Sequence, residues 1–332
     1  QSIDWIYTPL LIRELHDKAF YMSYHILSID ACTCHLSCDK GQLRCVDGEN
    51  PPRTIPLEDV GAVVLSSFKA TLTSNLLIEL ARKRIGFVLC ESYRPAVLLL
   101  PADRATDTAL LRHLADMPAR LRNRLWQKTL DAKCGNQTAL AQVWNPHHPA
   151  IAELKRMAVT EKTAREAECA RLFWSVFADT WANSDFRRGR HEEGFNNLFN
   201  YAYAVLLSCV LQYLFALGLD PCFGIFHQSR EHAAPLAYDL MEPFRPAFDA
   251  NVARWIHLCL QEGKTEERAG EITREFRRHI TATLQASVMH QNKQMPLKAA
   301  VEAVCRSFRK AVLAGQSGPY EPWHMTTIKW AG

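Results

Sequence analysis

The chain has 332 residues, of which 48% are hydrophobic and 22% are charged. These values are ordinary for globular proteins and exclude a disordered or coiled-coil chain. The 39 Lys and Arg against 35 Asp and Glu give a formal net charge of +4, which permits a nucleic-acid partner without requiring one. Eleven cysteines, an odd number, favour reduced thiols over a disulfide framework. Asp4 and Arg13 interrupt the first apolar run, so we expect no secretory signal.

The first hundred residues are rich in short runs of Val, Ile, Leu, Thr and Cys that are separated by turns, a pattern typical of strands. We expect strands over residues 25–38, 42–46, 62–65, 85–90 and 96–100. Leucines at helical spacing predict one helix over residues 71–82. The cysteines in the early strands match no familiar zinc-site spacing, so we interpret them as packed thiols; they are Cys32, Cys34, Cys38 and Cys45.

The rest of the chain has helical periodicity. We expect helices over residues 108–133, 151–157, 162–181, 197–217, 248–261, 267–289 and 297–314. Residues 201–219 are apolar enough to span a membrane, but Ser208 and Gln212 interrupt them, so we expect a buried central helix. The sequence therefore predicts an α+β protein with a strand-rich domain over residues 1–101, a helical domain over residues 102–314 and an irregular tail over residues 315–332.

Two residues stand out as candidates for chemistry. Glu166 is a carboxylate on an otherwise apolar helix face, because the residues three, four and seven positions later are Cys, Ala and Phe. An unpaired buried charge is costly, so Glu166 is either partnered or a ligand. His227 ends a turn that contains Gly218, Pro221 and Gly224. Such a rigid approach would hold an imidazole at a fixed angle, although a histidine packed in the core is the commoner case.

Asp239 and Glu242 add two carboxylates at a spacing that places both on one side of a helical turn. Pro243 predicts either a helix start or a kink at this point. Acidic residues at a helix N-terminus would give the same pattern without any site. Glu166, His227 and Glu242 together supply two carboxylates and one imidazole, a set that suits Mg²⁺ or Mn²⁺ better than zinc.

Other signatures are absent: the sequence contains no GxxxxGK[ST] phosphate loop, no GxGxxG after a strand and no GxSxG elbow. Basic residues gather in three clusters, which solvated helix faces or a phosphate-binding surface would both explain. The clusters are Arg187, Arg188 and Arg190; Arg274, Arg277 and Arg278; and Arg306, Arg309 and Lys310.

Several of these segments resemble the CRISPR-associated spacer-acquisition integrases, the "Cas one" family. The motif-bearing runs are GLDPCFGIFH over residues 218–227, LAYDLMEPFRPAFD over residues 236–249, EAECARLF over residues 166–173 and NNLFNYAY over residues 196–203. Residues 55–60, together with Trp126, Lys133, Asn136 and Gln137, look like the version found in type II systems. Phe173 stands where the family usually has Tyr, and Ala167 and Ala202 replace glycines.

The resemblance implies an N-terminal β-sandwich-like domain for dimerisation, followed by a larger all-helical catalytic domain. It also implies a metal-dependent DNA integrase and endonuclease of prokaryotic antiviral defence, acting in the cytoplasm. Its metal would be Mg²⁺ or Mn²⁺, held by Glu166, His227 and Glu242, with Asp239 close by. Its partners would be double-stranded DNA (the prespacer and the CRISPR repeat), a second copy of the chain, and a small dimeric partner, "Cas two", flanked by two such homodimers.

Further residues are assigned supporting roles. Asn196 and Tyr203 are candidates for positioning the substrate, and the DNA would contact Arg187, Arg188, Arg245, Arg277 and Arg278. Two alternatives stay open from the residues. In one, the protein is a DNA-binding scaffold whose acids form salt bridges and bind no metal. In the other, it is a repair nuclease that cuts branched DNA with the same site.

Overall fold

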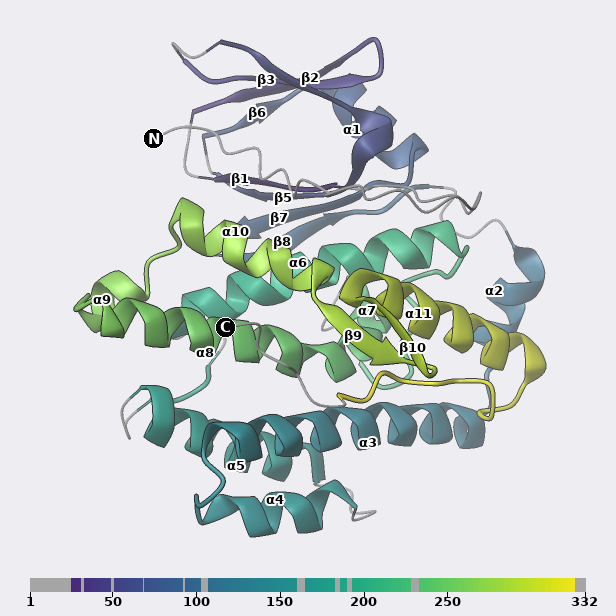
Figure 1. Cartoon of the computed structure of the whole chain (residues 1–332). Coiled ribbons are helices and arrows are strands. Elements are labelled where there is room, and N and C mark those ends of the chain that lie inside the picture. The colour runs from purple at the N-terminus through teal and green to yellow at the C-terminus, as the bar shows by residue number, and fades with distance from the viewer. Residues whose placement is uncertain are drawn as a thin grey trace.

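The computed structural model describes residues 25–30, 33–48, 51–67, 69–91, 93–102, 107–159, 165–182, 186–189, 193–227 and 233–325. Two four-stranded sheets come first and lie one above the other at one end of the molecule (Figure 1). The first has the order β1 (His25–Asp30), β5 (Val60–Ser66), β7 (Gly86–Glu91) and β8 (Arg94–Leu99). The second has the order β4 (Arg53–Pro56), β3 (Gln42–Val46), β2 (His35–Asp39) and β6 (Thr71–Leu72).

Alternation of side chains along the strands gives the first sheet two buried faces. Leu27 of β1 and Val63 of β5 pack with Leu36, Leu43 and helix α1 (Ser74–Arg82) in one cluster between the sheets. The opposite face packs against helices in the main core; its residues are Ile26, Ala62, Val64, Val88 and Cys90. The parallel pairings β1–β5 and β5–β7 suit a sheet covered on both faces.

The expected strand over residues 25–38 is wrong as a single element, because β1 and β2 belong to different sheets. Apolar periodicity is the same in either arrangement, so it does not reveal where a chain changes sheet. The expected helix over residues 71–82 begins only at Ser74, because Thr73 caps it by accepting a hydrogen bond from the amide of Leu76. Cys34 and Cys45 are buried free thiols, as expected, whereas Cys32 lies outside the described residues.

The chain then becomes mostly helical, which confirms the α+β class. The helices are α2 (Thr108–Ala115), α3 (Ala119–Trp144), α4 (Ala150–Ala158), α5 (Arg165–Trp181), α6 (Phe195–Ala216), α7 (Pro235–Met241), α8 (Arg245–Gln261), α9 (Glu266–Ala269), α10 (Arg274–Ala282) and α11 (Leu297–Ala314). Short 3₁₀ turns cover Leu57–Asp59, Glu242–Phe244 and Thr283–Gln285. A hairpin of β9 (Ser287–His290) and β10 (Lys293–Pro296) lies between α10 and α11.

Two helix predictions need correction. The expected helix over residues 108–133 is two helices, because Pro118 disfavours a helical conformation in the residue before it and starts α3 afresh. The expected helix over residues 267–289 is α9, α10 and then β9, so the region after residue 107 is not all-helical. Gln291 and Asn292 adopt φ angles of 51° and 58° and make the hairpin turn.

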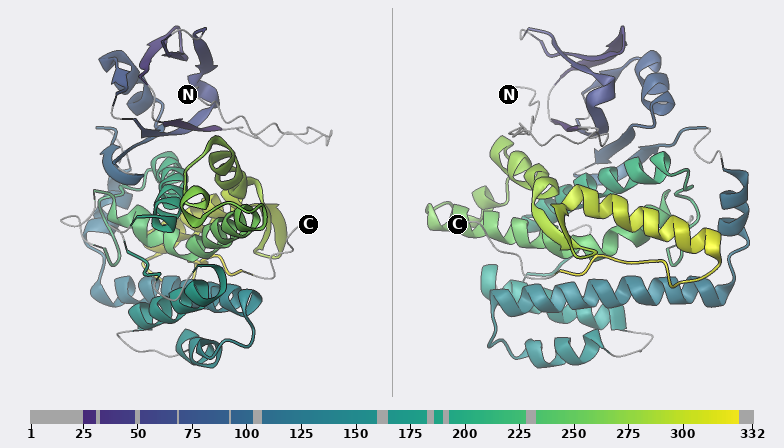
Figure 2. Two further views of the ribbon diagram at one scale, coloured as in Figure 1. Left: turned by 90° about the vertical axis from the view of Figure 1, so that its left-hand side faces the viewer. Right: turned by 45° about the vertical axis from the view of Figure 1, so that its right-hand side comes forward.

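Helix α6 lies beneath the first sheet and is surrounded by α8, α10 and α11 (Figures 1 and 2). It is long and apolar enough to cross a membrane, but 89% of that window is buried inside the protein, which confirms the expected buried helix. Tyr201 donates a hydrogen bond of 2.8 Å to Ser28 of β1. A Cβ at Gly86 of β7 would lie 3.0 Å from the Ser208 carbonyl oxygen, so the glycine permits the sheet to approach the helix closely.

The C-terminal segment, defined here as residues 315–325, runs along α3 without forming a helix or strand (Figure 2). The Lys128 ammonium donates to its carbonyl oxygens at Ser317 and Tyr320, at 2.9 and 2.6 Å. Thr129 of α3 and the Tyr320 hydroxyl are 2.9 Å apart. Tyr320 and Trp323 are buried, so this segment completes the core. Residues 326–332 lie outside the described part.

Candidate active site

A cavity of about 330 Å³ lies where α3, α5, α6, α7 and α8 meet the edge strand β8. It brings together the three predicted metal ligands Glu166, His227 and Glu242, which come from distant parts of the sequence. Its other lining residues are Arg94, Pro95, Lys133, Trp174, Arg188, Asn200, Tyr203, Tyr238 and Arg245. The cavity is therefore rich in charge of both signs.

The turn before His227 is organised by one buried carboxylate. Asp239 of α7 accepts backbone hydrogen bonds from the amides of Ile225, Phe226 and His227, at 2.6, 3.1 and 3.2 Å. Glycine is needed at 224, because a Cβ there would lie 2.8 Å from Pro235 Cβ and 3.0 Å from Asp239 Oδ2. The Gly and Pro pattern of the sequence thus encodes close packing of this turn on α7.

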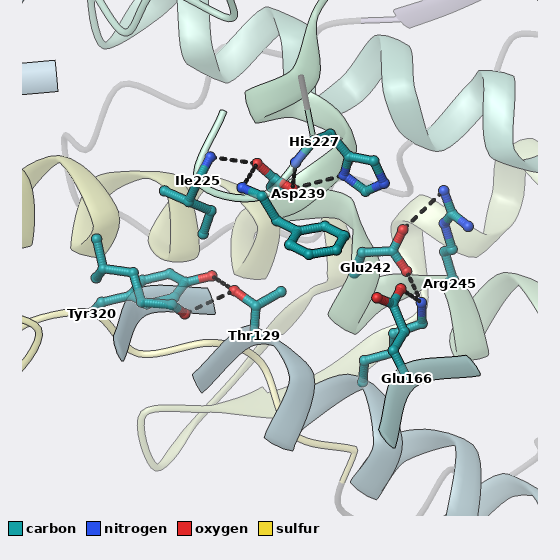
Figure 3. A network of polar contacts seen from close by, with 11 residues as sticks. Thr129, Glu166, Ile225, His227, Asp239, Glu242, Arg245 and Tyr320 are labelled. Atoms are coloured by element: carbon teal, nitrogen blue, oxygen red, sulfur yellow. Dashed lines mark hydrogen bonds and ion pairs between the residues drawn. The ribbon is translucent and has the colours of Figure 1, made fainter. Parts of the chain in front are cut away.

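Asp239 also orients the His227 ring (Figure 3). Its Oδ1 lies 2.7 Å from His227 Nδ1. Since a carboxylate accepts, Nδ1 carries the proton and Nε2 is the ring nitrogen that can coordinate a metal. Burial raises the pKa of Asp239, and the hydrogen bond with His227 only partly offsets this. Asp239 is therefore placed to position the histidine rather than to ligate a metal itself.

Lys133 of α3 lies between the two glutamates. Its ammonium is 2.7 Å from Glu166 Oε1 and 2.6 Å from Glu242 Oε2. The Glu242 side chain is 2% exposed, that of Lys133 is 8% exposed and that of Glu166 is 27% exposed. Burial disfavours the charge on Lys133, but the two carboxylates outweigh it and raise its pKa.

Glu242 has a second cationic partner one helical turn on. Arg245 Nη2 lies 3.0 Å from Glu242 Oε1 (Figure 3). Burial would raise the pKa of Glu242, but Arg245 and Lys133 together lower it, so the carboxylate is charged. Of the two sequence interpretations of Pro243, the kink is correct, because α7 passes through the 3₁₀ turn into α8 with Glu242 at the bend.

A second polar contact, between Tyr203 of α6 and Asp249 of α8, joins these two helices near the cavity. The Tyr203 hydroxyl donates to Asp249 Oδ1 at 2.5 Å. The guanidinium carbons of Arg188 and Arg245 lie 5.4 and 4.7 Å from the centre of the Tyr203 ring. Burial raises the pKa of Asp249 to about 7. Asn196 accepts from Arg188 Nη1 at 2.8 Å, so its side chain holds the arginine in place.

The remaining predicted DNA contacts differ in exposure. Arg187 and Arg278 are exposed, Arg188 and Arg245 line the cavity. Arg277 is buried and donates to the carbonyl of Ile272. Its position favours a structural role over a phosphate contact.

The donor set suits a divalent cation in type and in charge. Two carboxylates and an imidazole are ligands that Mg²⁺ and Mn²⁺ accept, and the ammonium between Glu166 and Glu242 is itself a cation at that position. Within the described residues, no group of three or more His, Cys, Asp or Glu side chains is arranged to hold a metal ion as it stands. The Lys133 ammonium already pairs with one oxygen of each glutamate.

A family model described as "CRISPR associated protein Cas1" matches residues 27–286, well over half of the chain. The chain belongs to the Cas1 family. The predicted family is thus confirmed, and residues 166, 227 and 242 lie inside the matched range. The C-terminal segment falls outside the match.

Relatives and solved Cas1 structures agree with this assignment. The "CRISPR-associated endonuclease Cas1" of Neisseria meningitidis is 27% identical over 284 residues, covering 83% of this chain and 88% of the relative. That match is consistent with the predicted resemblance to the type II version. A "Cas6-RT-Cas1--Cas2 complex" superposes with a TM-score of 0.74 at 18% identity, covering 95% of this chain and 38% of that one. A "Casposase bound to integration product" gives 0.63 at 17%, covering 91% and 96%. At these identities the structures show a shared fold.

From the sequence, Lys133 was named only within the resemblance to the type II version and was given no role, although it lies between the two glutamates of the cavity. Lys133, Asn136 and Gln137 are polar residues buried on α3. Buried polar side chains need hydrogen-bond partners, so three of them within five positions indicate a polar network. The sequence gives this signal only when α3 is already known to be a buried helix. Arg94 was missed, and nothing local in the sequence distinguishes it; Asn200 lies in the motif over residues 196–203 but was given no role.

Proposed function

We propose that this chain is a metal-dependent DNA integrase and endonuclease that inserts short DNA fragments into a CRISPR array. The observation that carries the proposal is the convergence of Glu166, His227 and Glu242 on one cavity beside Arg188 and Arg245. The names of the relatives support nuclease chemistry, and the fold shared with a casposase bound to an integration product supports strand joining.

In this proposal Glu166, Glu242 and His227 hold Mg²⁺ or Mn²⁺. The bound ion would stabilise charge on phosphodiester oxygens and ease deprotonation of an attacking hydroxyl. Asp239 keeps Nδ1 of His227 protonated, and Arg245 fixes one oxygen of Glu242. The reaction is a transesterification: the 3′ oxygen of the incoming fragment forms a bond to the phosphorus at the 5′ end of the repeat, and the bond from that phosphorus to the 3′ oxygen of the flanking strand breaks, which leaves a 3′-hydroxyl on that strand.

The proposed function also implies partners for this chain. A solved Cas1–Cas2 complex shares the fold, which supports Cas2 and double-stranded DNA as partners. We infer that the domain over residues 1–101, whose described strands form two sheets around one core, dimerises, and that residues 102–314 carry catalysis and DNA binding. Two homodimers would flank the Cas2 dimer in the cytoplasm of a prokaryote, with Arg187 and Arg278 available to DNA phosphates.

One observation favours a second candidate, a DNA-binding scaffold without catalysis. Both glutamates of the site are in ion pairs with Lys133, and Glu242 also pairs with Arg245. A site satisfied in this way needs no metal to be stable. Dependence on a metal therefore separates the two candidates.

The test is an integration assay with the full chain, its Cas2 partner, Mn²⁺, a short duplex and a supercoiled plasmid carrying the array. We expect joined products that disappear with a chelator and with Glu166→Gln. Glu168→Gln is the matched control, since Glu168 is on the same helix but pairs only with the exposed Arg171 in the described structure. Products that persist in the chelator would reject the metal-dependent integrase. In a parallel reaction on a branched duplex, cleavage without any joining in the plasmid assay would favour the repair nuclease.

A further inference from the structure

Charge balance in the cavity raises a question about Lys133. The four groups Glu166, Glu242, Lys133 and Arg245 carry two negative and two positive charges, so their sum is zero. Adding a divalent cation without moving Lys133 would place two positive charges within a few ångströms of an existing one, in a site where little water screens them. Like charges this close repel strongly where the effective dielectric is low.

Lys133 and a divalent ion would also compete for the same carboxylate oxygens. Lys133 holds Oε1 of Glu166 and Oε2 of Glu242, while Arg245 holds Oε1 of Glu242. The ammonium thus lies between one oxygen of Glu166 and one oxygen of Glu242. A divalent ion bound through these same two oxygens would take the position of the ammonium.

We propose that Lys133 is an internal placeholder cation: it holds Glu166 and Glu242 together before metal binds, and its ammonium leaves that position when a divalent ion enters. The inference rests on the proposed function. Lysine suits the role because its charge sits on a flexible four-carbon stem, and the cavity of about 330 Å³ that it lines gives the stem room to turn. Arg245 lies on the far oxygen of Glu242 and can stay in place.

The Lys133 ammonium also stabilises the folded chain when no metal is bound. Glu242 is 2% exposed, and a second carboxylate beside it would repel it if no cation lay between them. An uncompensated buried charge is strongly destabilising. With Lys133 in place, α3, α5 and the 3₁₀ turn assemble around a neutral site, so the ligands are already gathered when metal arrives.

Two measurements on the full chain test this proposal. Calorimetry measures the affinity for Mn²⁺, and thermal unfolding measures the melting temperature with and without Mn²⁺. Lys133→Met is expected to bind Mn²⁺ at least about tenfold more tightly than the unmodified chain, because the competing charge is gone. Its melting temperature should be lower without Mn²⁺ and should rise more when Mn²⁺ is added. Lys133→Arg, which keeps the charge on a bulkier group, should bind Mn²⁺ more weakly. Lys264→Met removes a lysine from an exposed ion pair and should change neither property.

The outcomes separate the two proposals. If the unmodified chain binds Mn²⁺ and Lys133→Met binds it equally or less tightly, the placeholder is wrong while the metal site stands. If neither binds Mn²⁺, both proposals fail. If Lys133→Met does not fold without Mn²⁺, Lys133→Gln replaces it, and folding that Mn²⁺ restores in either variant supports the placeholder; failure of Mn²⁺ to stabilise them contradicts it.

Discussion

Replacing Glu242 with glutamine (Glu242→Gln) is expected to lower strand-joining activity by more than about 100-fold, because even residues that only support metal ligands cost 10- to 100-fold in affinity or activity. The same change should destabilise the fold. Lys133 and Arg245 would lose a buried counter-charge, and breaking a buried ion pair on one side costs about 3–5 kcal/mol. Activity assays and urea unfolding of the same preparation measure both effects.

Glu166→Gln provides the comparison. Glu166 is 27% exposed and has lost less water on folding, so its replacement should abolish joining with a loss of unfolding free energy near 1 kcal/mol or less. Equal destabilisation by the two variants would argue against the account of Glu242 as the buried anchor of the site. Full activity in either variant would remove that glutamate from the metal ligands.

Trp323→Ala is expected to destabilise the protein by about 3–5 kcal/mol, the usual cost of truncating a large buried aromatic. Trp323 is 2% exposed and stacks on Phe244 with ring centres 5.4 Å apart. Its indole donates to the carbonyl of Met289 at 3.2 Å. Urea unfolding measures the loss; Glu321→Gln, at an exposed neighbouring position, is the control and should change stability little.

The same variant should also weaken Mn²⁺ binding. Asn136 Nδ2 donates both to the Pro243 carbonyl at 2.7 Å and to the Trp323 carbonyl at 3.1 Å. The C-terminal segment therefore supports the turn that carries Glu242. A loss of stability below about 1 kcal/mol, far from the range for buried aromatics, would show that the segment is not part of the core.

How far the sequence predicts this molecule depends on the range of the interactions involved. The α+β class, helix α6 and the choice of Glu166, His227 and Glu242, which line one cavity, follow from local periodicity and from motifs. The assignment of residues 25–38 to two sheets does not, since period-2 patterns carry no information about the pairing partner. Pro118 indicates a helix boundary in the sequence, but the apolar periodicity continues across it and led to the prediction of one helix in place of two.

In the site, too, local patterns were predictable from the sequence and long-range contacts were not. Asp239 could be placed near Glu242 from spacing alone, but its three backbone acceptor contacts at residues 225–227 depend on a turn folding back onto α7. Lys133 lies 33 residues before Glu166, and no local rule connects them. Trp323 and Pro322 suggest an irregular tail by composition, and only tertiary packing makes that tail part of the core.

The most direct measurement is a crystal structure of the full chain grown with Mn²⁺, with the ion located by its anomalous scattering. We expect one peak in the cavity, bonded to a carboxylate oxygen of Glu166, a carboxylate oxygen of Glu242 and Nε2 of His227, with the Lys133 ammonium moved away. A map with no anomalous peak among these three side chains, at Mn²⁺ concentrations that support strand joining, would contradict the account.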